Sequence, residues 1–345
     1  MKALRKVTSG KGTLQLEEMA KPTPQHGNVL LKVKAAGICG TDIHIMQDEF
    51  PHQVPVTLGH EVAGEIVKLG PGVHSWSVGD KVITESYFSV CGQCEYCRGG
   101  RPNLCTDRRS IGSAVDGGMA EFVEVPAVNL HKIPDHVSWT AAALTEPLAC
   151  TVHALNQVRI QPGEWVVISG PGPMGLLALQ VARAAGGKVI MLGITQDAER
   201  LKAAQKLGAS SVINVEATDY EAVVSQIVEM TEGGAPVVLE CSGAGPSASL
   251  LFDVVRKRGR YGQIGLYGKS IPVNMDMVCY KELVVTGTNA SIPSAWTRAL
   301  TLLEDGAVTD EAVVSGVWSL ENWEDAFKTV IAKGALKVML GETSK

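Results

Sequence analysis

The first part of the chain alternates short apolar runs with turns that are rich in glycine. The runs that have the length and the β-branched content of strands are residues 28–39, 60–70, 80–88 and 118–126. Turn clusters such as GPGVHSW and SAVDGG separate them. Short strands between glycine-rich turns predict a partly open β-barrel or sandwich for this region.

The pattern changes after about Thr151. Residues 164–170, EWVVISG, fit a buried parallel strand, and residues 174–186 carry a broad apolar face of helical spacing. The strands expected beyond them are 188–193, 211–215, 236–243, 260–266 and 282–288, and the helices are 198–208, 220–230 and 246–256. Strands that alternate with helices predict a parallel sheet with right-handed crossovers, and therefore an α/β fold.

The pattern loosens from about Asn289. The elements expected there are a helix over 294–306, a strand over 314–320, a helix over 322–334 and a strand over 335–340. This tail is too short to bury a core of its own, so we expect it to pack on the first domain. A length of 345 residues suits two domains. We therefore predict one domain over 1–150 and 289–345 and another over 151–288.

Composition and charge exclude several classes of protein. With 45% hydrophobic and 19% charged residues, the chain can bury a substantial core. It has 31 basic and 36 acidic residues, and a net charge of −5 gives no basic surface for nucleic acid or an anionic membrane. Glycine and proline interrupt the longest apolar region, 166–182, and the first residues lack the apolar core of a secretory signal. We expect a cytoplasmic protein whose eight cysteines are reduced.

Four of those cysteines lie in one short segment, with the spacing Cys91-x2-Cys94-x2-Cys97-x7-Cys105. Four thiolates can surround one zinc ion tetrahedrally, and four sulfur ligands leave no open position, so such a site is structural. An iron–sulfur cluster is the chemical alternative, but the proline that usually follows the last cysteine is replaced by Thr106. The longer last spacing favours a single metal ion.

A second group of metal-binding residue types is dispersed: Cys39, His60, Glu61 and Glu146. A thiolate, an imidazole and carboxylates make a mixed ligand set that leaves room for water or substrate on the metal. Taken singly, each has an ordinary explanation, such as a buried small thiol for Cys39 and surface carboxylates for the two glutamates. Spacing alone therefore leaves both interpretations open.

The third signal is a glycine-rich turn, Gly170-Pro171-Gly172-Pro173-Met174-Gly175. It has the form G-x-G-x-x-G, and it follows an expected strand and begins an expected helix, as a dinucleotide-binding turn must. Its first glycine makes the tight turn, its second lets the backbone approach a pyrophosphate, and its third allows the helix to pack on the strand. The helix N-terminus favours the phosphate charge.

Together these motifs resemble the zinc-dependent medium-chain dehydrogenase/reductase family, the group of alcohol, sorbitol and threonine dehydrogenases. The run Gly59-His60-Glu61-x2-Gly64-x5-Gly70-x2-Val73 fits the family's zinc pattern at every fixed position. Cys39-Gly-Thr41-Asp42-x-His44, the cysteine lobe and the glycine turn follow the family's order. The resemblance covers essentially the whole chain. It implies a GroES-like, partly open β-barrel catalytic domain and a doubly wound Rossmann cofactor domain.

The resemblance also implies roles for single residues and two zinc ions per chain. The catalytic zinc would be held by Cys39, His60, Glu61 and, directly or through water, Glu146, while the cysteine lobe would hold the structural zinc. Asp42 would accept a hydrogen bond from His60. Thr41 and His44 would relay the proton of the substrate hydroxyl to solvent. A carboxylate at position 146, where alcohol dehydrogenases carry cysteine, favours the polyol branch.

The cofactor implied is NAD or NADP. Contacts are expected from Gly170, Gly172, Pro173, Met174, Gly175, Thr195, Arg200, Gly265 and Leu266. NAD-binding folds usually place an acidic residue about 20 residues beyond the glycines. Thr195 stands there, Asp197 is expected to cap the next helix, and Arg200 is close by, so a 2′-phosphate could be tolerated.

For the substrate, the resemblance points to a polyol or sugar alcohol, which could be phosphorylated. Threonine dehydrogenases usually carry a histidine just before the cysteine lobe, where this chain has Tyr87 and Phe88. A threonine dehydrogenase or a general alcohol dehydrogenase is the alternative. Arg108, Arg109 and Lys269 are candidate phosphate partners. The apolar strand 282–288 could pair subunits in a homodimer or homotetramer.

Hypotheses from other classes of protein make different predictions about metal content. A zinc-ribbon binding module would use only the cysteine lobe, and a quinone-reductase-type relative would bind NADPH without an active-site metal. Two zinc ions per chain support the polyol dehydrogenase hypothesis, whereas one or none supports the others.

Overall fold

The computed structural model describes residues 1–332 and 335–342, and in it the chain forms two compact units. The first consists of Met1–Glu146, Ile292–Glu304 and the described chain after Val314; the second consists of Pro147–Ser291 and Asp305–Val313. The sequence analysis assigned 305–313 to the first domain. In the structure Gln180 donates to the carbonyl of Thr309 and accepts from its amide, which ties this segment to the second unit. Residues 333–334 and 343–345, part of the expected tail, lie outside the described residues.

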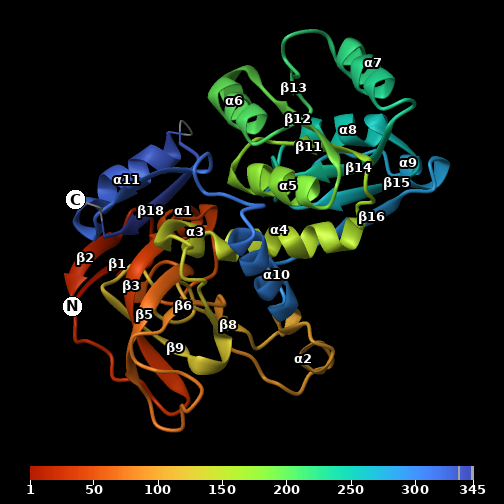
Figure 1. Ribbon diagram of the computed structural model, residues 1–345. Coiled ribbons are helices and arrows are strands. Elements are labelled where there is room, and N and C mark those ends of the chain that lie inside the picture. The colour runs from red at the N-terminus through yellow and green to blue at the C-terminus, as the bar shows by residue number, and fades with distance from the viewer. Residues whose placement is uncertain (333–334, 343–345) are drawn as a thin grey trace. The chain divides into compact units, whose positions relative to one another are not determined.

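The first unit is built on a mixed sheet with strand order β10-β6-β5-β3-β18-β17, in which β9 also pairs with β3 (Figure 1). Its strands are β3 (Asn28–Gly37), β5 (Glu61–Leu69), β6 (Lys81–Thr84), β9 (Phe122–Pro126), β10 (Leu130–Lys132), β17 (Val314–Trp318) and β18 (Lys337–Gly341). A smaller sheet joins β1 (Lys2–Lys6) to β2 (Leu14–Glu18) and β4 (Val56–Thr57). The tail strand β18 thus lies between β3 and β17, inside the sheet.

The apolar positions of these strands form the core of the first unit. Val29, Leu31, Val62 and Ile66 are fully or almost fully buried in one cluster. A second cluster joins Leu4, Ile45 and Leu58 to Phe327 and Val338 of the tail. The tail therefore packs into the first unit through helix α11 (Trp323–Ile331) and β18.

One expected strand is interrupted. The sequence analysis predicted a single strand over 80–88, but the structure has β6 and then β7 (Tyr87–Ser89). The amide of Glu85 still donates to Asn129, whereas the carbonyl of Ser86 accepts from Ile111. The chain thus changes its partner between these residues, and β7 pairs instead with β8 (Arg109–Ser110) in a short ribbon.

The second unit contains a parallel sheet with strand order β13-β12-β11-β14-β15-β16. Its strands are β11 (Trp165–Ser169), β12 (Lys188–Gly193), β13 (Ser211–Asn214), β14 (Ala235–Glu240), β15 (Val255–Gln263) and β16 (Val284–Gly287). The helices between them are α5 (Pro173–Ala184), α6 (Ala198–Lys206), α7 (Tyr220–Met230), α8 (Gly245–Val254) and α9 (Asp276–Tyr280). Counted along the chain the order is 3-2-1-4-5-6, the order of the doubly wound Rossmann fold, so the predicted α/β fold class is confirmed.

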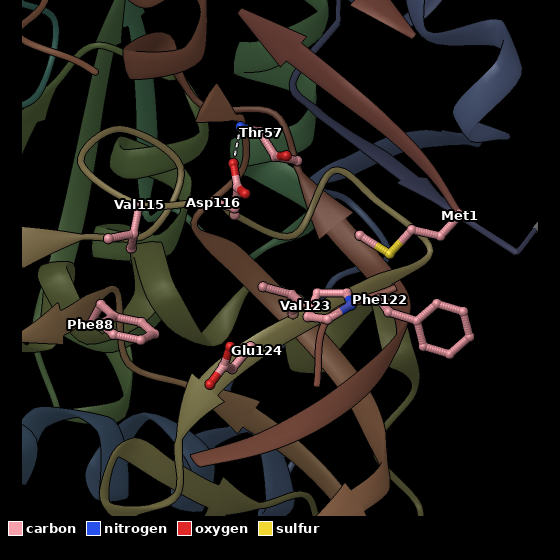
Figure 2. A pocket seen from close by; sticks show the side chains of 10 residues that line it. Met1, Thr57, Phe88, Val115, Asp116, Phe122, Val123 and Glu124 are labelled. Atoms are coloured by element: carbon pink, nitrogen blue, oxygen red, sulfur yellow. Dashed lines mark hydrogen bonds between the residues drawn. The ribbon is translucent and has the colours of Figure 1, made fainter. Parts of the chain in front are cut away.

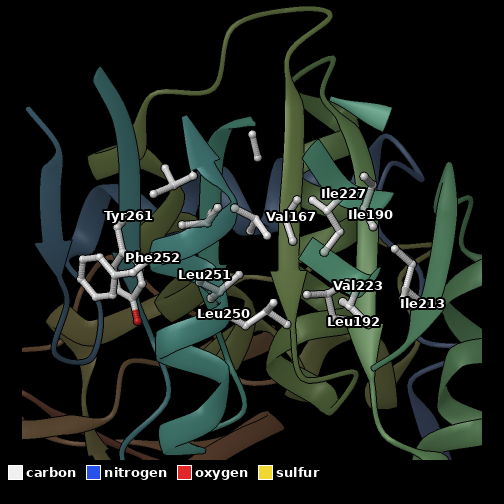
Figure 3. Packing of buried hydrophobic residues seen from close by; sticks show 14 of the residues in the cluster. Val167, Ile190, Leu192, Ile213, Val223, Ile227, Leu250, Leu251, Phe252 and Tyr261 are labelled. Atoms are coloured by element: carbon white, nitrogen blue, oxygen red, sulfur yellow. The ribbon is translucent and has the colours of Figure 1, made fainter. Parts of the chain in front are cut away.

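Continuous apolar strands explain why this sheet is buried. Val167, Ile190 and Leu192 are almost inaccessible, and Val223 and Ile227 of α7 pack on them (Figure 3). Phe252 stacks on Tyr261 with ring centroids 4.8 Å apart at the other end of the same cluster. Strands that are buried on both faces show the uninterrupted hydrophobic runs that predicted this domain.

Five further α-helices are present in the described residues. They are α1 (Gly40–Met46), α2 (Glu95–Arg98), α3 (Trp139–Ala143), α4 (Thr145–Val158) and α10 (Pro293–Glu304). Across the described residues, no helix has both the length and the apolar character needed to cross a lipid bilayer.

Candidate metal centres and cofactor turn

The dispersed residues of the predicted catalytic centre meet in the first unit. Ligand atoms of Cys39, His60 and Glu61 all lie within 4.8 Å of one another. Cys39 directly precedes helix α1, and Glu61 is the first residue of β5, opposite Gly37 of β3. Glu61 is fully buried, while Cys39 and His60 are partly buried. Adjacent antiparallel strands thus bring together residues that are about 20 positions apart.

Two glycines make room for this arrangement. A Cβ atom on Gly37 would stand 1.9 Å from Oε2 of Glu61, so only glycine leaves space for the carboxylate. Gly59 has a φ of +93°, and a Cβ there would meet the amide nitrogen of Met119 at 2.8 Å. This left-handed residue, which favours glycine, sets the backbone direction immediately before His60.

Asp42 ties the two ligand-bearing segments together. Its carboxylate accepts hydrogen bonds from the amides of Cys39, at 2.8 Å, and Gly59, at 3.2 Å. The resemblance implied that Asp42 accepts a hydrogen bond from the imidazole of His60. In the described structure it accepts instead from the backbone amide of Gly59, next to His60. The reason is local, because Asp42 lies in the first turn of α1 and folds back over the helix N-terminus.

Electrostatics favour a positive charge in this cluster. Burial disfavours the charged imidazole of His60, but Cys39, Asp42 and Glu146 outweigh it and raise the pKa of His60 well above its usual value. Burial raises the pKa of Asp42, against the influence of His60 and the Cys39 amide. The same negative partners would favour a divalent cation at this cluster.

Glu146 lies near this cluster without belonging to its innermost group. It is 7% exposed and stands in the first turn of α4. It interacts electrostatically with both His60 and Lys337, but it is absent from the described ligand atoms that share the 4.8 Å cluster. This position suits a carboxylate that reaches a metal through water or after a small movement.

The donor set fits zinc. Sulfur, imidazole nitrogen and carboxylate oxygen are its usual protein ligands. Oε2 of Glu61 is buried and has no hydrogen-bond partner, although a buried carboxylate oxygen normally finds one. A cation bound between Cys39 and His60 would give this oxygen a partner. Cys39, His60 and Glu61, with Glu146 beside them, therefore could hold the catalytic metal.

The residues predicted for the proton relay lie on helix α1. The hydroxyl of Thr41 is 3.8 Å from the sulfur of Cys39. His44, three residues further along, is exposed, and its Nδ1 lies 3.0 Å from a carboxylate oxygen of Glu49. Residues i and i+3 share a helix face, so these two groups lead from the cluster toward solvent.

The cysteine lobe forms a second candidate metal site, apart from the first. The sulfur of Cys91 lies 3.9 Å from that of Cys97 and 3.5 Å from that of Cys105. Ligands at about 2.3 Å in a tetrahedron would stand roughly 3.8 Å apart. These distances fit a single zinc ion, and the β7–β8 ribbon closes the base of the lobe.

Backbone amides support thiolate character in this lobe. The amides of Gln93 and Cys94 lower the pKa of Cys91 to about 6. Burial and the neighbouring thiols raise the pKa of Cys97 to about 12, because the cluster without a cation cannot hold every thiolate. Amides of Cys94 and Cys97 donate to the preceding sulfurs, which orients these groups before any metal binds.

The glycine turn has the shape predicted for phosphate binding. Gly170 has a φ of +97° and packs against Ser242, and a Cβ on Gly175 would stand 1.9 Å from the Gly170 carbonyl. Gly172 differs, since a Cβ there would meet nothing within 4 Å. The first and third glycines thus serve packing, while the second keeps a space open at the N-terminus of α5, which starts with Pro173 and Met174.

A buried carboxylate that sequence reasoning missed organises the neighbouring loops. Glu240, the last residue of β14, accepts from the amides of Ser242 and Gly243 and from the side chain of Gln263. Gly265 packs against it, because a Cβ there would meet the Gly243 amide at 2.5 Å and Glu240 at 2.7 Å. Leu266, next in the chain, is 89% exposed. The sequence signal that could have revealed Glu240 is an acidic residue at the end of an expected strand, followed by small residues.

The end of β12 carries the residues expected to face the cofactor ribose. The amide of Thr195 donates to Glu216 at 2.9 Å, and its hydroxyl accepts from Asn214 at 3.1 Å. Arg200 lies 3.4 Å from Asp197. Glu216 follows β13. The search for an acidic residue about 20 positions beyond the glycine turn, where Thr195 stands, could therefore not find it.

The candidate phosphate partners have other roles or stand elsewhere. Arg108 donates to the carbonyl of Asn103 and Arg109 to that of Ala114, so both brace the lobe. Lys269 lies exposed in the second unit. A cavity of about 210 Å³ in the first unit is lined by Phe88, Asp116 and Glu124 among others (Figure 2), and its lining residues do not include the candidate ligands of the catalytic metal.

Comparison with known proteins agrees with this arrangement. Residues 25–135 match the alcohol dehydrogenase GroES-like domain and residues 173–305 match the zinc-binding dehydrogenase family. The sorbitol dehydrogenase of Halalkalibacterium halodurans is 43% identical over 99% of both chains, and the D-arabitol-phosphate dehydrogenase of Enterococcus avium is 37% identical over 99% of this chain and 97% of its own. A Sinorhizobium meliloti 1021 protein bound to NADP superposes with a TM-score of 0.91 at 33% identity, with 99% of both chains covered.

A Rossmann unit, together with a GroES-like unit that carries two groups of metal-binding residues, defines a zinc-binding dehydrogenase. The chain belongs to the zinc-dependent medium-chain dehydrogenase/reductase family, in its polyol dehydrogenase branch. The family and enzyme class predicted from the motifs are confirmed.

Proposed function

We propose that this protein oxidises a secondary hydroxyl group of a polyol or sugar alcohol and transfers the hydride to NAD, with the reverse reduction open to it. The observation that carries the proposal is the buried cluster of Cys39, His60 and Glu61 with its unpartnered carboxylate oxygen. The carboxylate of Glu146 beside it supports a polyol substrate, because alcohol dehydrogenases carry a cysteine there. The names of the sorbitol and arabitol-phosphate relatives point the same way.

The side chains at the candidate centre would each have a separate role in the oxidation. Zinc, when bound by Cys39, His60, Glu61 or Glu146, would lower the pKa of the substrate hydroxyl. Asp42 holds the two ligand segments in register through their amides. Thr41 would accept the hydroxyl proton as it gives up its own, and His44, exposed and paired with Glu49, would release a proton to solvent at the end of the relay.

In the cofactor unit, the residues of the glycine turn would hold the pyrophosphate. The open space at Gly172 and the N-terminus of α5 suit a diphosphate, whose charge the helix N-terminus favours. Glu240 would keep the loops that carry Gly243 and Gly265 in place. The protein's contribution is therefore the placing of two reactants rather than new covalent chemistry.

We propose a preference for NAD over NADP, because of the charges near Thr195. Arg200 would attract a 2′-phosphate, but Asp197 lies 3.4 Å from it and offsets its charge. Glu216, bonded to the Thr195 amide, adds a further negative charge. A ribose 2′-hydroxyl can donate to such a carboxylate, whereas a phosphate is repelled by it.

The proposal extends to assembly and location. Edge strand β16 leaves Val284 53% and Val285 42% exposed, which supports pairing between subunits in a homodimer or homotetramer. Light scattering on the purified protein tests this, and a monomer at assay concentration contradicts it. The free thiols of the candidate metal sites support a reducing compartment, and therefore the cytoplasm.

The direct test is a screen of sorbitol and related polyols, their phosphates and L-threonine, each with NAD and NADP, followed by the absorbance of reduced nicotinamide. The expected result is turnover of an unphosphorylated polyol with NAD, and two zinc ions per chain by metal analysis. Turnover of threonine alone would contradict the polyol assignment, and fewer than two bound metals would contradict the ligand assignment.

A further inference from the structure

A buried lysine lies against the candidate catalytic centre. Lys337 is the first residue of β18 and is only 4% exposed. Its ammonium group donates to Oε1 of Glu61 at 2.6 Å and to the carbonyl of Ile38 at 3.1 Å. A lysine is almost never fully buried unless it is paired, and here its partner is a candidate metal ligand.

These contacts hold Glu61 by one oxygen only. Oε1 is engaged by Lys337, while Oε2 is buried without a hydrogen-bond partner on the side of Gly37. Removal of one partner from a buried ion pair leaves an uncompensated charge, so Glu61 without Lys337 would seek another cation. The nearest site for one is the cluster with Cys39 and His60, whose ligand atoms lie within 4.8 Å.

The same lysine also fixes the backbone before Cys39. The carbonyl of Ile38 accepts from Lys337, and the amide of Ile38 donates to the carbonyl of Val338 at 2.9 Å. Both backbone polar groups of Ile38 are therefore bound to β18. A residue 276 positions from Glu61 in the chain thus orients the approach to both Cys39 and Glu61.

The contact between Lys337 and Glu61 also contributes to the charge balance of the candidate centre. With Cys39 as thiolate, the candidate ligands Cys39, Glu61 and Glu146 carry three negative charges, and a divalent cation supplies two positive ones. Lys337 supplies a third within the same buried region. The Asp42 carboxylate is left out of this count, because two backbone amides donate hydrogen bonds to it.

We propose that Lys337 is a positioning residue that competes with the metal for Glu61, and so keeps the centre from closing into a fully protein-ligated site. This inference rests on the proposed catalytic metal centre. It implies that Lys337 keeps a metal position open for substrate and makes the ion more exchangeable than the ligand set alone would allow. Without the lysine, both oxygens of Glu61 are free for the metal.

The test compares the zinc-loaded wild type with Lys337→Met and Lys337→Arg. We expect Lys337→Met to keep two metal ions per chain and to release one of them to a colorimetric zinc chelator about 10- to 100-fold more slowly, the range expected when a hydrogen bond from a charged group no longer competes for the Glu61 carboxylate. Release from the cysteine lobe gives an internal reference in the same experiment. The cobalt(II) form of Lys337→Met should show shifted visible absorption bands, because its ligand set changes, and Lys337→Arg should restore both properties toward the wild type.

Lys6→Met is a matched control, because Lys6 is also fully buried but bonds backbone carbonyls such as that of Met46, and no candidate ligand. Its release rate and spectrum should equal those of the wild type. Unchanged release and an unchanged cobalt spectrum in Lys337→Met would overturn the proposal, as would faster release. If Lys337→Met does not fold, Lys337→Gln takes its place with the same expectations. A wild type that holds no metal at Cys39 instead contradicts the proposed function itself.

Discussion

The two candidate metal sites of this protein are built in opposite ways. The cysteine lobe draws all its sulfurs from 15 consecutive residues, 91–105, and none of its ligands depends on a distant strand. The other centre takes Cys39 from the residue before helix α1, Glu61 from β5 and its cationic neighbour Lys337 from β18 of the tail. Local spacing creates the first site, whereas only the completed sheet creates the second.

The difference in construction suits the two sites to different roles, one in stability and one in catalysis. A site in a single loop can hold that loop together without influencing the rest of the sheet, which suits a structural ion. A site assembled from several strands has its ligands fixed by the core of the unit, which suits the exact placing of a reacting group. Substitutions at one metal site should therefore leave the other metal site unchanged.

The largest effect is expected for Cys39→Ser. Loss of Lewis-acid catalysis is worth several kcal/mol, so turnover should fall by about 10³-fold or more. Metal analysis should find one zinc per chain, and the melting temperature should change little. Cys279→Ser, which alters an exposed cysteine outside both sites, is the control and should retain two zinc ions. Retention of two zinc ions in Cys39→Ser would remove this residue from the ligand set.

Cys97→Ser should give the reverse pattern. Loss of a structural metal is among the strongly destabilising changes, and we expect the melting temperature to fall by about 10 °C. The turnover number measured well below that temperature should stay close to the wild-type value. Thermal unfolding followed by circular dichroism, together with metal analysis, checks both parts. A loss of turnover without a loss of stability would show that the lobe takes part in catalysis.

Gly37→Ala should disturb the dispersed site alone. The new Cβ would occupy the place of Oε2 of Glu61, so the carboxylate must move within a buried space. We expect kcat/KM to fall by about 10- to 100-fold, as for other neighbours of metal ligands, with no change in lobe zinc. Gly287→Ala is the control, since its Cβ would find neighbours only at 4.0 Å. Equal kinetics for the two variants would mean that Glu61 needs no fixed position.

The smallest effect is expected in the cofactor unit, which holds neither metal site. Glu216→Gln removes one negative charge near Thr195. Two unit charges about 4 Å apart in water interact by about 1 kcal/mol, so kcat/KM for NADP relative to NAD should rise by about fivefold or more. Glu199→Gln, which alters an exposed carboxylate of α6 paired with Lys202, should leave the ratio unchanged. A ratio that does not move in Glu216→Gln would place the discriminating group elsewhere.

Periodic and closely spaced signals could be read from the sequence. Continuous apolar strands predicted the parallel sheet, and the bounds expected for β12 and α7 agree with the structure. Helix α4 was not anticipated, because Thr145, Glu146 and Pro147 open it with residues more typical of a turn, although proline is well tolerated in a first helical turn. The interrupted strand over 80–88 was missed for a related reason, since its partner change depends on Asn129 and Ile111.

The candidate site divides in the same way. Motif order and the family resemblance brought forward Cys39, His60 and Glu61, which the structure places together. Neither Lys337 nor Glu216 could be found from the sequence, since each contacts a residue in a distant part of the chain. Asp42 was expected to bond His60 but instead bonds amides, because it caps the helix that follows Cys39. Contacts made by tertiary pairing leave no periodic trace in a single chain.

The place of β18 within the first sheet has a consequence for biosynthesis. The ribosome makes β3, β5 and the whole second unit before it reaches β18. During that interval Cys39, His60 and Glu61 can gather without the ammonium group of Lys337 beside them. A nascent polypeptide that captures an ion early does so at a more negative cluster than the mature fold presents. Insertion of β18 would then bring the ammonium group to Glu61 and change the charge that surrounds the ion.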